Sequence, residues 1–225
     1  MKLRDIKIYF KMFFHYRPKT FWNELLSNSF DLRGVGHFRL SNEANLKMYQ
    51  EKEKIIRDEL PKNNIKIDGN SIVLEIGCGT GYWIELLRSF GVKNYTGNDI
   101  ADVSISTLKQ KFPEYNFLLG DISEIPLPGN AFDLAMMIDV TQHITDDRKF
   151  NKGLNNVWQS LKPDSYFLVT MWDPGKNVYL ANKLRLNRIE KPRGIDWYKK
   201  IIRDEGFIIS NVEFNDKYLL IIKKR

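Results

Sequence analysis

Three glycines in five residues follow an apolar, strand-like run in the segment VLEIGCGTGYW, residues 73–83. Glycine lacks a Cβ, so Gly77, Gly79 and Gly81 let the backbone turn sharply and approach a ligand closely. The helix expected after Gly81 would offer the free N–H groups of its first turn to a carboxylate or a phosphate. A turn that binds nothing does not need three glycines, so we expect a ligand-binding loop between a strand and a helix.

The spacing of these glycines disfavours two common nucleotide-binding loops. A dinucleotide fingerprint has the spacing G-x-G-x-x-G, and its third glycine would fall at Tyr82. This argues against a nicotinamide-dependent oxidoreductase. A P-loop requires Gly-Lys followed by Ser or Thr, and no such lysine follows Gly81. The observed spacing, G-x-G-x-G, belongs to neither loop.

Short apolar runs alternate with helical segments from residue 71 onward. Strands are expected at 71–76, 94–98, 115–119, 132–138 and 165–172, and helices at 81–90, 102–111, 146–161 and 195–205. This alternation predicts a doubly wound α/β fold whose parallel sheet is covered on both faces. Two further strand-like runs, 207–214 and 217–222, are joined by Asn215-Asp216, a hairpin turn signal. The sheet is therefore expected to end in an antiparallel hairpin.

The first 60 residues lie outside this alternation. Apolar side chains recur at helical spacing over 3–16, with basic side chains on another face of the same helix. A second helix, capped by Ser41, is expected to end before Pro61. We therefore expect an N-terminal helical cap at 1–60 and a ligand-binding domain at 61–225, which carries a basic insert at 173–194.

Glu75, two residues before Gly77, completes a segment that resembles motif I of the class I S-adenosylmethionine-dependent methyltransferases. The resemblance covers residues 71–172 and the terminal hairpin. It implies a Rossmann-like, mostly parallel seven-stranded sheet that ends in an antiparallel hairpin. It also implies S-adenosylmethionine as the cofactor, with S-adenosylhomocysteine as the product. The implied function is transfer of a methyl group to an oxygen or nitrogen atom of a small metabolite.

In this family an acidic residue at the end of the second strand binds the ribose hydroxyls, and Asp99 stands there, 18 residues after Gly81. A carboxylate accepts two hydroxyl hydrogens at once, which fits this role. An aspartate after the third strand meets the adenine amino group, and Asp121 matches it. An aspartate in either place can also be a turn or helix-cap residue. The resemblance implies cofactor contacts from Glu75, Gly77, Cys78, Gly79, Gly81, Asp99, Ile100, Asp121, Ile122 and Asp139.

The segment 139–144 resembles the loop after the fourth strand of the family. His143 in this loop would lie at the carboxyl edge of the sheet, and its ordinary pKa near 6.5 suits a general base. His143 could instead be a packing residue that shapes the cofactor pocket. His37, in the glycine-containing loop 34–39, is the second candidate base. Some relatives hold a metal with carboxylates after the fourth strand, but Gln142 stands at one such place, so we predict no metal.

The positive charge of the chain is concentrated in two segments. The chain has 35 Lys and Arg against 28 Asp and Glu, a net charge of +7. Residues 1–20 and 172–194 together hold the whole of this excess, and both lie outside the main region of resemblance. An anionic acceptor or an anionic surface is expected to meet them. The candidate substrate-binding residues are Trp172, Lys176, Arg185 and Arg188, although a solvated basic helix would carry the same charges.

Two other function classes use some of these features. An RNA methyltransferase would use the net charge, but the chain lacks an Asn-Pro-Pro-Tyr-type motif and a second cysteine, so nucleic acid is not the expected partner. A non-catalytic, cofactor-binding homologue that acts as an interaction partner is the other alternative.

The remaining expectations concern partners and location. Residues 3–16 could form a lid over the pocket, a contact between two copies of the chain, or a peripheral membrane contact. The chain is expected to be a monomer or a homodimer. The single cysteine excludes an intramolecular disulfide. No uncharged apolar stretch approaches the ~20 residues of a membrane span. A cytoplasmic protein is therefore expected.

Overall fold

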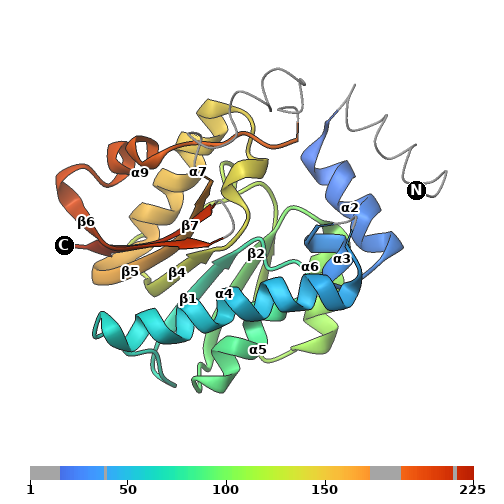
Figure 1. The fold of residues 1–225 in the computed structure, drawn as a ribbon, viewed down its shortest axis with the longest axis horizontal. Helices are drawn as coiled ribbons and strands as arrows, with labels where there is room; N and C mark the ends of the chain where they lie inside the picture. Colours follow the sequence, from blue (N-terminus) through green and yellow to red (C-terminus); the bar gives the residue numbers. More distant parts are fainter. Residues whose placement is uncertain (1–15, 38–39, 173–188, 215–216) are drawn as a thin grey trace.

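The structure is a computed structural model that describes residues 16–37, 40–172, 189–214 and 217–225 (Figure 1). Most of the helix expected at 3–16 and the turn expected at 215–216 lie outside the described residues, as do Lys176, Arg185 and Arg188. The described chain begins with three helices, α2 (Pro18–Asn28), α3 (Leu32–Val35) and α4 (Asn42–Lys62).

The strands form one seven-stranded sheet in the order β3-β2-β1-β4-β5-β7-β6. Their bounds are β1 (Ile72–Ile76), β2 (Asn94–Asp99), β3 (Asn116–Leu119), β4 (Phe132–Met137), β5 (Leu161–Trp172), β6 (Gly206–Phe214) and β7 (Lys217–Lys224). Strands β1 to β5 pair in parallel, and β7 lies antiparallel between β5 and β6. The order confirms the expected α/β sheet, mostly parallel and ending in an antiparallel hairpin.

Helices cover both faces of the sheet, because successive side chains of a strand point to opposite faces. The α-helices after β1 are α5 (Tyr82–Ser89), α6 (Asp102–Lys111), α7 (Asp147–Ser160) and α9 (Ile195–Ile202), with 3₁₀ turns η1 (Thr141–His143) and η3 (Arg203–Glu205). Val73 belongs to the core shared with α4 and α5, whereas its neighbour Leu74 belongs to the core shared with α7 and α9. Figure 1 shows these helix pairs on opposite faces of the sheet.

The topology places a crevice at the carboxyl ends of β1 and β4. The chain runs outward from β1 through β2 to β3 and then crosses back to β4 on the other side of β1. Such a switch in strand order leaves the loops after the two central strands diverging to opposite faces. The glycine loop follows β1 and the His143 loop follows β4, so the fold brings both to this crevice.

Two expected boundaries are wrong. Helix α4 continues through Pro61 to Lys62, because proline lacks only a donor and its carbonyl still accepts the N–H of Asn64 at 3.0 Å. Strand β5 begins at Leu161 rather than at 165, because Leu161 already pairs with Phe132 across a register shift.

The N-terminal helices pack on the domain rather than apart from it. The Asn23 side chain of α2 donates to the Asp102 carboxylate at 2.8 Å and accepts the Val103 N–H at 3.1 Å, which ties α2 to the first turn of α6. The boundary expected at residue 60 falls inside α4, whose Ile56 and Leu60 belong to the sheet core. No helix in the described ranges is both long and apolar enough to cross a membrane.

Candidate active site

The glycine loop turns through backbone conformations that side chains rarely adopt. Gly77, Gly79 and Gly81 have φ angles of +74°, +52° and +84°. A Cβ on Gly77 would lie 2.3 Å from Cγ2 of Val140, the residue that follows Asp139 after β4. The two loops of the crevice therefore approach each other so closely that only glycine fits at position 77.

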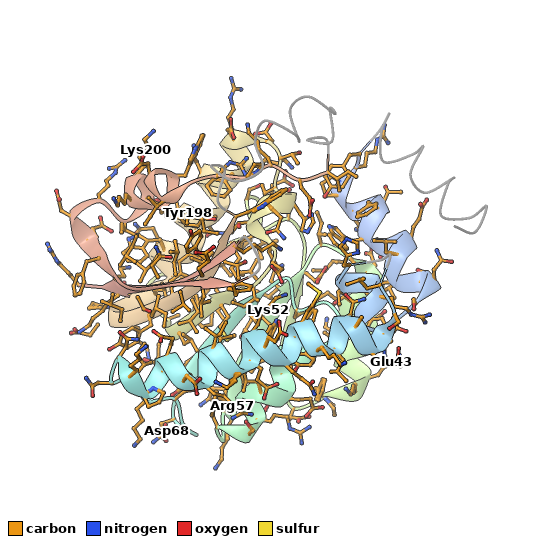
Figure 2. All side chains as sticks on the ribbon, in the orientation of Figure 1. Glu43, Lys52, Arg57, Asp68, Tyr198 and Lys200 are labelled. Atoms are coloured by element: carbon orange, nitrogen blue, oxygen red, sulfur yellow. The ribbon has the colours of Figure 1, made fainter. Side chains whose placement is uncertain are left out.

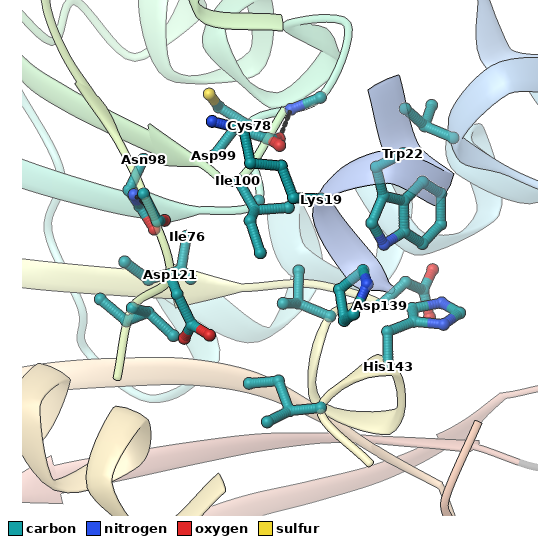
Figure 3. Close-up of a pocket in the computed structure, with 18 of the residues that line it drawn as sticks. Lys19, Trp22, Ile76, Cys78, Asn98, Asp99, Ile100, Asp121, Asp139 and His143 are labelled. Carbon is teal, nitrogen blue, oxygen red and sulfur yellow. Dashed lines mark hydrogen bonds between the residues drawn. The ribbon is translucent and has the colours of Figure 1, made fainter. Parts of the chain in front are cut away.

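A cavity of about 760 Å³ opens beside this loop, which is a size typical of small-molecule sites. Figure 3 shows Asp99 and Cys78 on one side of it and Trp22, Asp139 and His143 on the other. The sequence-predicted residues that line it are Gly77, Cys78, Gly79, Asp99, Ile100, Asp121, Ile122, Asp139 and His143. The structure therefore brings together residues from four loops, and their contacts with a cofactor stay predictions.

Asp99 ends β2 and faces the glycine loop across the cavity wall. One of its carboxylate oxygens accepts the Gly79 N–H at 2.8 Å (Figure 3). The other accepts the Ala101 N–H at 2.9 Å. Burial raises the pKa of Asp99 above its ordinary value, while these backbone hydrogen bonds act in the opposite direction. Each oxygen keeps a second lone pair, so the carboxylate can still accept hydroxyl groups.

Asp121 follows β3 and lies further along the same wall. One of its oxygens accepts from the Ser123 hydroxyl at 2.7 Å, and the other pairs with the Lys149 ammonium at 2.8 Å. Burial alone would raise the pKa of Asp121, but Lys149 and Ser123 outweigh burial and lower it. Asp121 is thus an ionised acceptor at the mouth of the cavity.

Glu75 does not line the cavity, although the sequence predicts it as a cofactor contact. It is buried within β1, where one of its oxygens accepts the Tyr95 hydroxyl at 2.6 Å and the other has no partner among the described residues. Burial raises the pKa of Glu75 to about 8. The Glu75 carboxyl is therefore protonated at neutral pH, and it supports the glycine loop from within β1.

This burial has a consequence for stability. A carboxyl whose pKa rises from 4.5 to about 8 on folding stabilises the folded state below pH 4.5 and loses that contribution as pH rises to about 8. We expect Glu75→Gln, which cannot ionise, to remove a slope of at most ~1.4 kcal/mol per pH unit between pH 5 and 8. Urea unfolding at several pH values measures the slope, and parallel curves for the two proteins would contradict the expectation.

Asp139 lies at the far side of the cavity, held between two lysines. It pairs with Lys52 of α4 and with Lys217 of β7, the latter at 2.7 Å. Figure 2 shows Lys52 on the side of α4 that faces the sheet. Burial would raise the pKa of Asp139, but the two ammonium groups outweigh burial and lower it well below its ordinary value. Asp139 is therefore a fixed anion and a poor proton acceptor.

His143 lines the cavity beside Asp139, under α2. Its ring meets the Trp22 ring edge-on with centroids 4.9 Å apart, and the Tyr16 hydroxyl donates to its backbone carbonyl at 3.3 Å. Burial lowers the pKa of His143 below its ordinary value, so the imidazole is neutral at pH 7.

The structure does not bring four other predicted residues to the cavity wall. His37 is exposed and does not line the cavity, and Asn45 bonds both its backbone N–H and its carbonyl. Its expected role as a base stays a prediction, and the structure does not place it at this cavity. Trp172, Gly81 and Glu75 are absent from the lining as well, and Gly81 lines a second, smaller pocket beside α4 and α5.

The aromatic cover and the two lysines that pair with Asp139 were not predicted. Trp22 reaches the site from α2 and Tyr16 from the segment just before it. Lys52 and Lys217 lie 87 and 78 residues away from Asp139 in the sequence. No short motif marks such distant pairs. The one local signal was the aromatic composition of the segment that includes Phe21 and Trp22.

The comparisons with known proteins agree with this geometry. Residues 74–169 match the family model described as "Methyltransferase domain". Residues 74–169 form a class I S-adenosylmethionine-dependent methyltransferase domain. A probable S-adenosylmethionine-dependent methyltransferase of Mycolicibacterium smegmatis is 26% identical over 48% of this chain and 42% of its own length. The chain spans less than half of this curated relative.

One further relative and one solved structure show the range of proteins that resemble this chain. A mitochondrial arginine hydroxylase of Rattus norvegicus is 27% identical over 64% of this chain and 42% of its own length, so the domain alone does not fix the reaction. The magnesium protoporphyrin IX methyltransferase of Synechocystis, solved with bound SAH, shares the fold at a TM-score of 0.62. Their identity is 15%, over 99% of this chain and 95% of that protein.

The residues present fit the cofactor of this domain, S-adenosylmethionine. The glycines give the backbone cradle that a Cβ would fill, and Asp99 and Asp121 offer carboxylate oxygens to hydroxyl and amino donors. The described residues contain no group of three or more His, Cys, Asp or Glu side chains placed to hold a metal ion.

Proposed function

We propose that this methyltransferase domain moves a methyl group from S-adenosylmethionine to an oxygen or nitrogen atom of a small, anionic metabolite. One observation carries the proposal: a single cavity joins the glycine loop and Asp99 to a second region enclosed by Trp22 and His143. The first region suits a nucleoside, and the second gives an acceptor a place beside it.

Three groups would hold the cofactor. Asp99 would accept the ribose hydroxyls, Asp121 would accept the adenine amino group, and the Ile122 N–H would meet a ring nitrogen. When bound, S-adenosylmethionine supplies an activated methyl group on a positively charged sulfur. The chain then has to align the acceptor with that methyl group and keep water away from it.

Helix α2 would provide much of this enclosure. Its Trp22 and Pro18 line the cavity, and its Lys19 and Asn23 side chains bind Asp102 at 3.1 Å and 2.8 Å. These polar contacts are exposed, and surface ion pairs contribute little to stability. These polar contacts therefore add little to the hold of α2 on the domain, which also comes from buried Leu26 and from the Trp22–His143 ring contact.

The anionic character proposed for the acceptor rests on the positive charge of the insert in the sequence. Lys176, Arg185 and Arg188 stay the proposed anion-binding residues of the insert. Arg193 has a structural role instead, because it is buried, pairs with Asp147 at 2.9 Å and lies 4.0 Å from the Phe150 ring centroid.

Calorimetry with S-adenosylhomocysteine tests the cofactor site. We expect one molecule to bind per chain and to stabilise the fold by about 2.7 kcal/mol at a ligand concentration 100 times Kd. Transfer of a labelled methyl group to small molecules then tests the reaction. Binding without transfer to any acceptor would favour the non-catalytic homologue, and absence of binding would contradict the proposal.

A further inference from the structure

The cofactor end of the cavity is the region beside the glycine loop and Asp99. The acidic and basic side chains that line it already have hydrogen-bond or ion-pair partners. Asp99 accepts two backbone N–H groups, and Asp121 pairs with Lys149. Lys149 also pairs with Glu124 at 2.8 Å. Asp146 caps α7 by accepting the N–H groups of its first turn. Within the described chain, none of these groups is poised to take a proton from an acceptor.

The acceptor end is the region enclosed by Trp22 and His143, and its ionisable side chains are held in the same way. Asp139 is held between two lysines, which favour its ionised form and weaken it as a base. Burial raises the pKa of Tyr49 and of Tyr16, so both phenols stay protonated. His143 is then the remaining candidate base at this end.

The two ring nitrogens of His143 point to groups that are not part of the cavity wall. Nδ1 lies 3.3 Å from the Ile189 carbonyl, and a carbonyl can only accept, so Nδ1 carries the proton. Nε2 lies 3.3 Å from the Gln142 amide nitrogen, whose other hydrogen goes to the Asp139 carbonyl at 3.0 Å. Nε2 therefore accepts from Gln142, so its lone pair is engaged, and the Glu190 carboxylate lies 3.9 Å from the same nitrogen. Glu190 acts to raise the pKa of His143, but burial outweighs it and the pKa is lowered.

One cation of the cavity wall has no such engagement. Lys19 pairs with Asp102 and Lys149 pairs with Asp121, whereas the guanidinium of Arg17 has no hydrogen-bond or ion-pair partner in the described ranges. Arg17 is exposed at the cavity wall, and its neighbour Tyr16 binds the His143 carbonyl at the acceptor end. A guanidinium is the side chain best suited to bind a carboxylate.

We propose that the acceptor is a carboxylic acid that is bound as its carboxylate by Arg17 and methylated on oxygen without a protein base. The inference rests on the proposed methyl transfer and narrows its acceptor. Carboxyl groups have ordinary pKa values near ~4, whereas phenols and amines titrate near ~10 and need a base at neutral pH. Of these three acceptors, the carboxylate is the one whose nucleophilic atom is already deprotonated at neutral pH.

The step balances without a proton. An electron pair of the carboxylate oxygen forms the new oxygen–carbon bond, the carbon–sulfur bond breaks, and its pair stays on sulfur as a neutral thioether. The negatively charged carboxylate and the positively charged sulfonium give a neutral ester and a neutral thioether. A hydroxyl or amine acceptor would release one proton for each methyl group transferred.

The state of His143 is tested without turnover. Nitrogen NMR of the full chain should show His143 as the neutral tautomer protonated on Nδ1, with a pKa below its ordinary value of 6.5. Gln142→Leu, which removes the donor to Nε2, should raise that pKa. A His143 that is protonated on Nε2 and titrates at or above 6.5 would overturn the claim that the site lacks a base.

The class of acceptor is tested with labelled product. The full chain is incubated with methyl-labelled S-adenosylmethionine and a deproteinised small-molecule extract of bacterial cells, and the product is treated with mild alkali. We expect the label to be released as methanol, because esters hydrolyse and methyl ethers and methylamines do not. An extract whose carboxyl groups have been converted to amides should accept no label.

Other outcomes separate the inference from the proposed function. Transfer of alkali-stable label would overturn the carboxylic acid and leave methyl transfer standing. Failure of transfer in a protein that binds S-adenosylhomocysteine would contradict both.

The role of Arg17 has its own variant and control. Arg17→Gln should reduce the rate at limiting extract by about 10-fold or more, the loss expected for a charge-assisted hydrogen bond, with part of the rate recovered at high extract concentration. Arg148→Gln removes an exposed arginine that does not line the cavity and should stay within twofold of the unmodified chain. Equal rates for the two variants would remove Arg17 from the site.

Discussion

Replacing Gly77 by alanine is expected to lower the free energy of unfolding by about 2–5 kcal/mol and to weaken S-adenosylhomocysteine binding at least tenfold. Two costs add at this position. The backbone has a φ of +74°, which costs a residue with a Cβ about 1–2 kcal/mol. The new Cβ would lie 2.3 Å from Cγ2 of Val140, and overpacking of this kind costs about 1–3 kcal/mol.

Two further variants separate these costs. Gly91→Ala introduces a Cβ at a φ of +85°, with its nearest neighbouring atom at 3.8 Å, so it measures backbone strain without a clash. Val140→Ala removes both methyl groups that the new Cβ would meet and leaves its own Cβ at 3.6 Å. Urea unfolding of the single and double variants gives the coupling between positions 77 and 140. A loss for Gly77→Ala no larger than that for Gly91→Ala would contradict the close approach of the two loops.

The sheet was predictable because its signals are local. Buried strands such as β1 and β4 are mostly apolar, each with a single acidic residue. The helices between them begin and end within a residue or two of expectation. The end of the sheet was harder to place. Residues 161–165 contain Pro163 and Asp164, which are typical of a turn, yet pairing of Leu161 with β4 extends β5 through them. Tertiary pairing overrides local preference there.

In the candidate site, too, local sequence predicts some residues, and contacts distant in sequence place the others. Glycines and aspartates that follow a strand directly were predicted because their positions depend only on the order of strands. The contacts of Asp139 and His143 were not, because Lys217, Ile189 and Trp22 reach them from elements distant in sequence. Those contacts decide the chemistry, since they fix Asp139 as an anion and engage both nitrogens of His143. A motif locates a candidate base, but its neighbours determine whether it can accept a proton.

Replacing Asp99 by alanine is expected to weaken S-adenosylhomocysteine binding by about 100-fold or more, since hydrogen bonds to charged groups contribute about 1.5–3 kcal/mol each. The variant loses the acceptor for the ribose hydroxyls. It also leaves the Gly79 and Ala101 N–H groups without their present partner, at 2.8 Å and 2.9 Å, so the glycine loop loses its tie to β2. Calorimetry measures the affinity, and urea unfolding measures how much of the loss is structural.

Asp99→Asn separates the two roles of the carboxylate. Its amide oxygen can keep one backbone N–H, but its NH₂ group faces the other donor and cannot accept a hydroxyl hydrogen. We expect Asp99→Asn to be more stable than Asp99→Ala and to bind S-adenosylhomocysteine almost as weakly as Asp99→Ala does. Asp58→Asn, which removes an exposed carboxylate paired with Lys54 on α4, is the control for lost charge and should leave the affinity within twofold. Near-normal affinity in Asp99→Asn would show that the carboxylate supports the loop without holding the ribose.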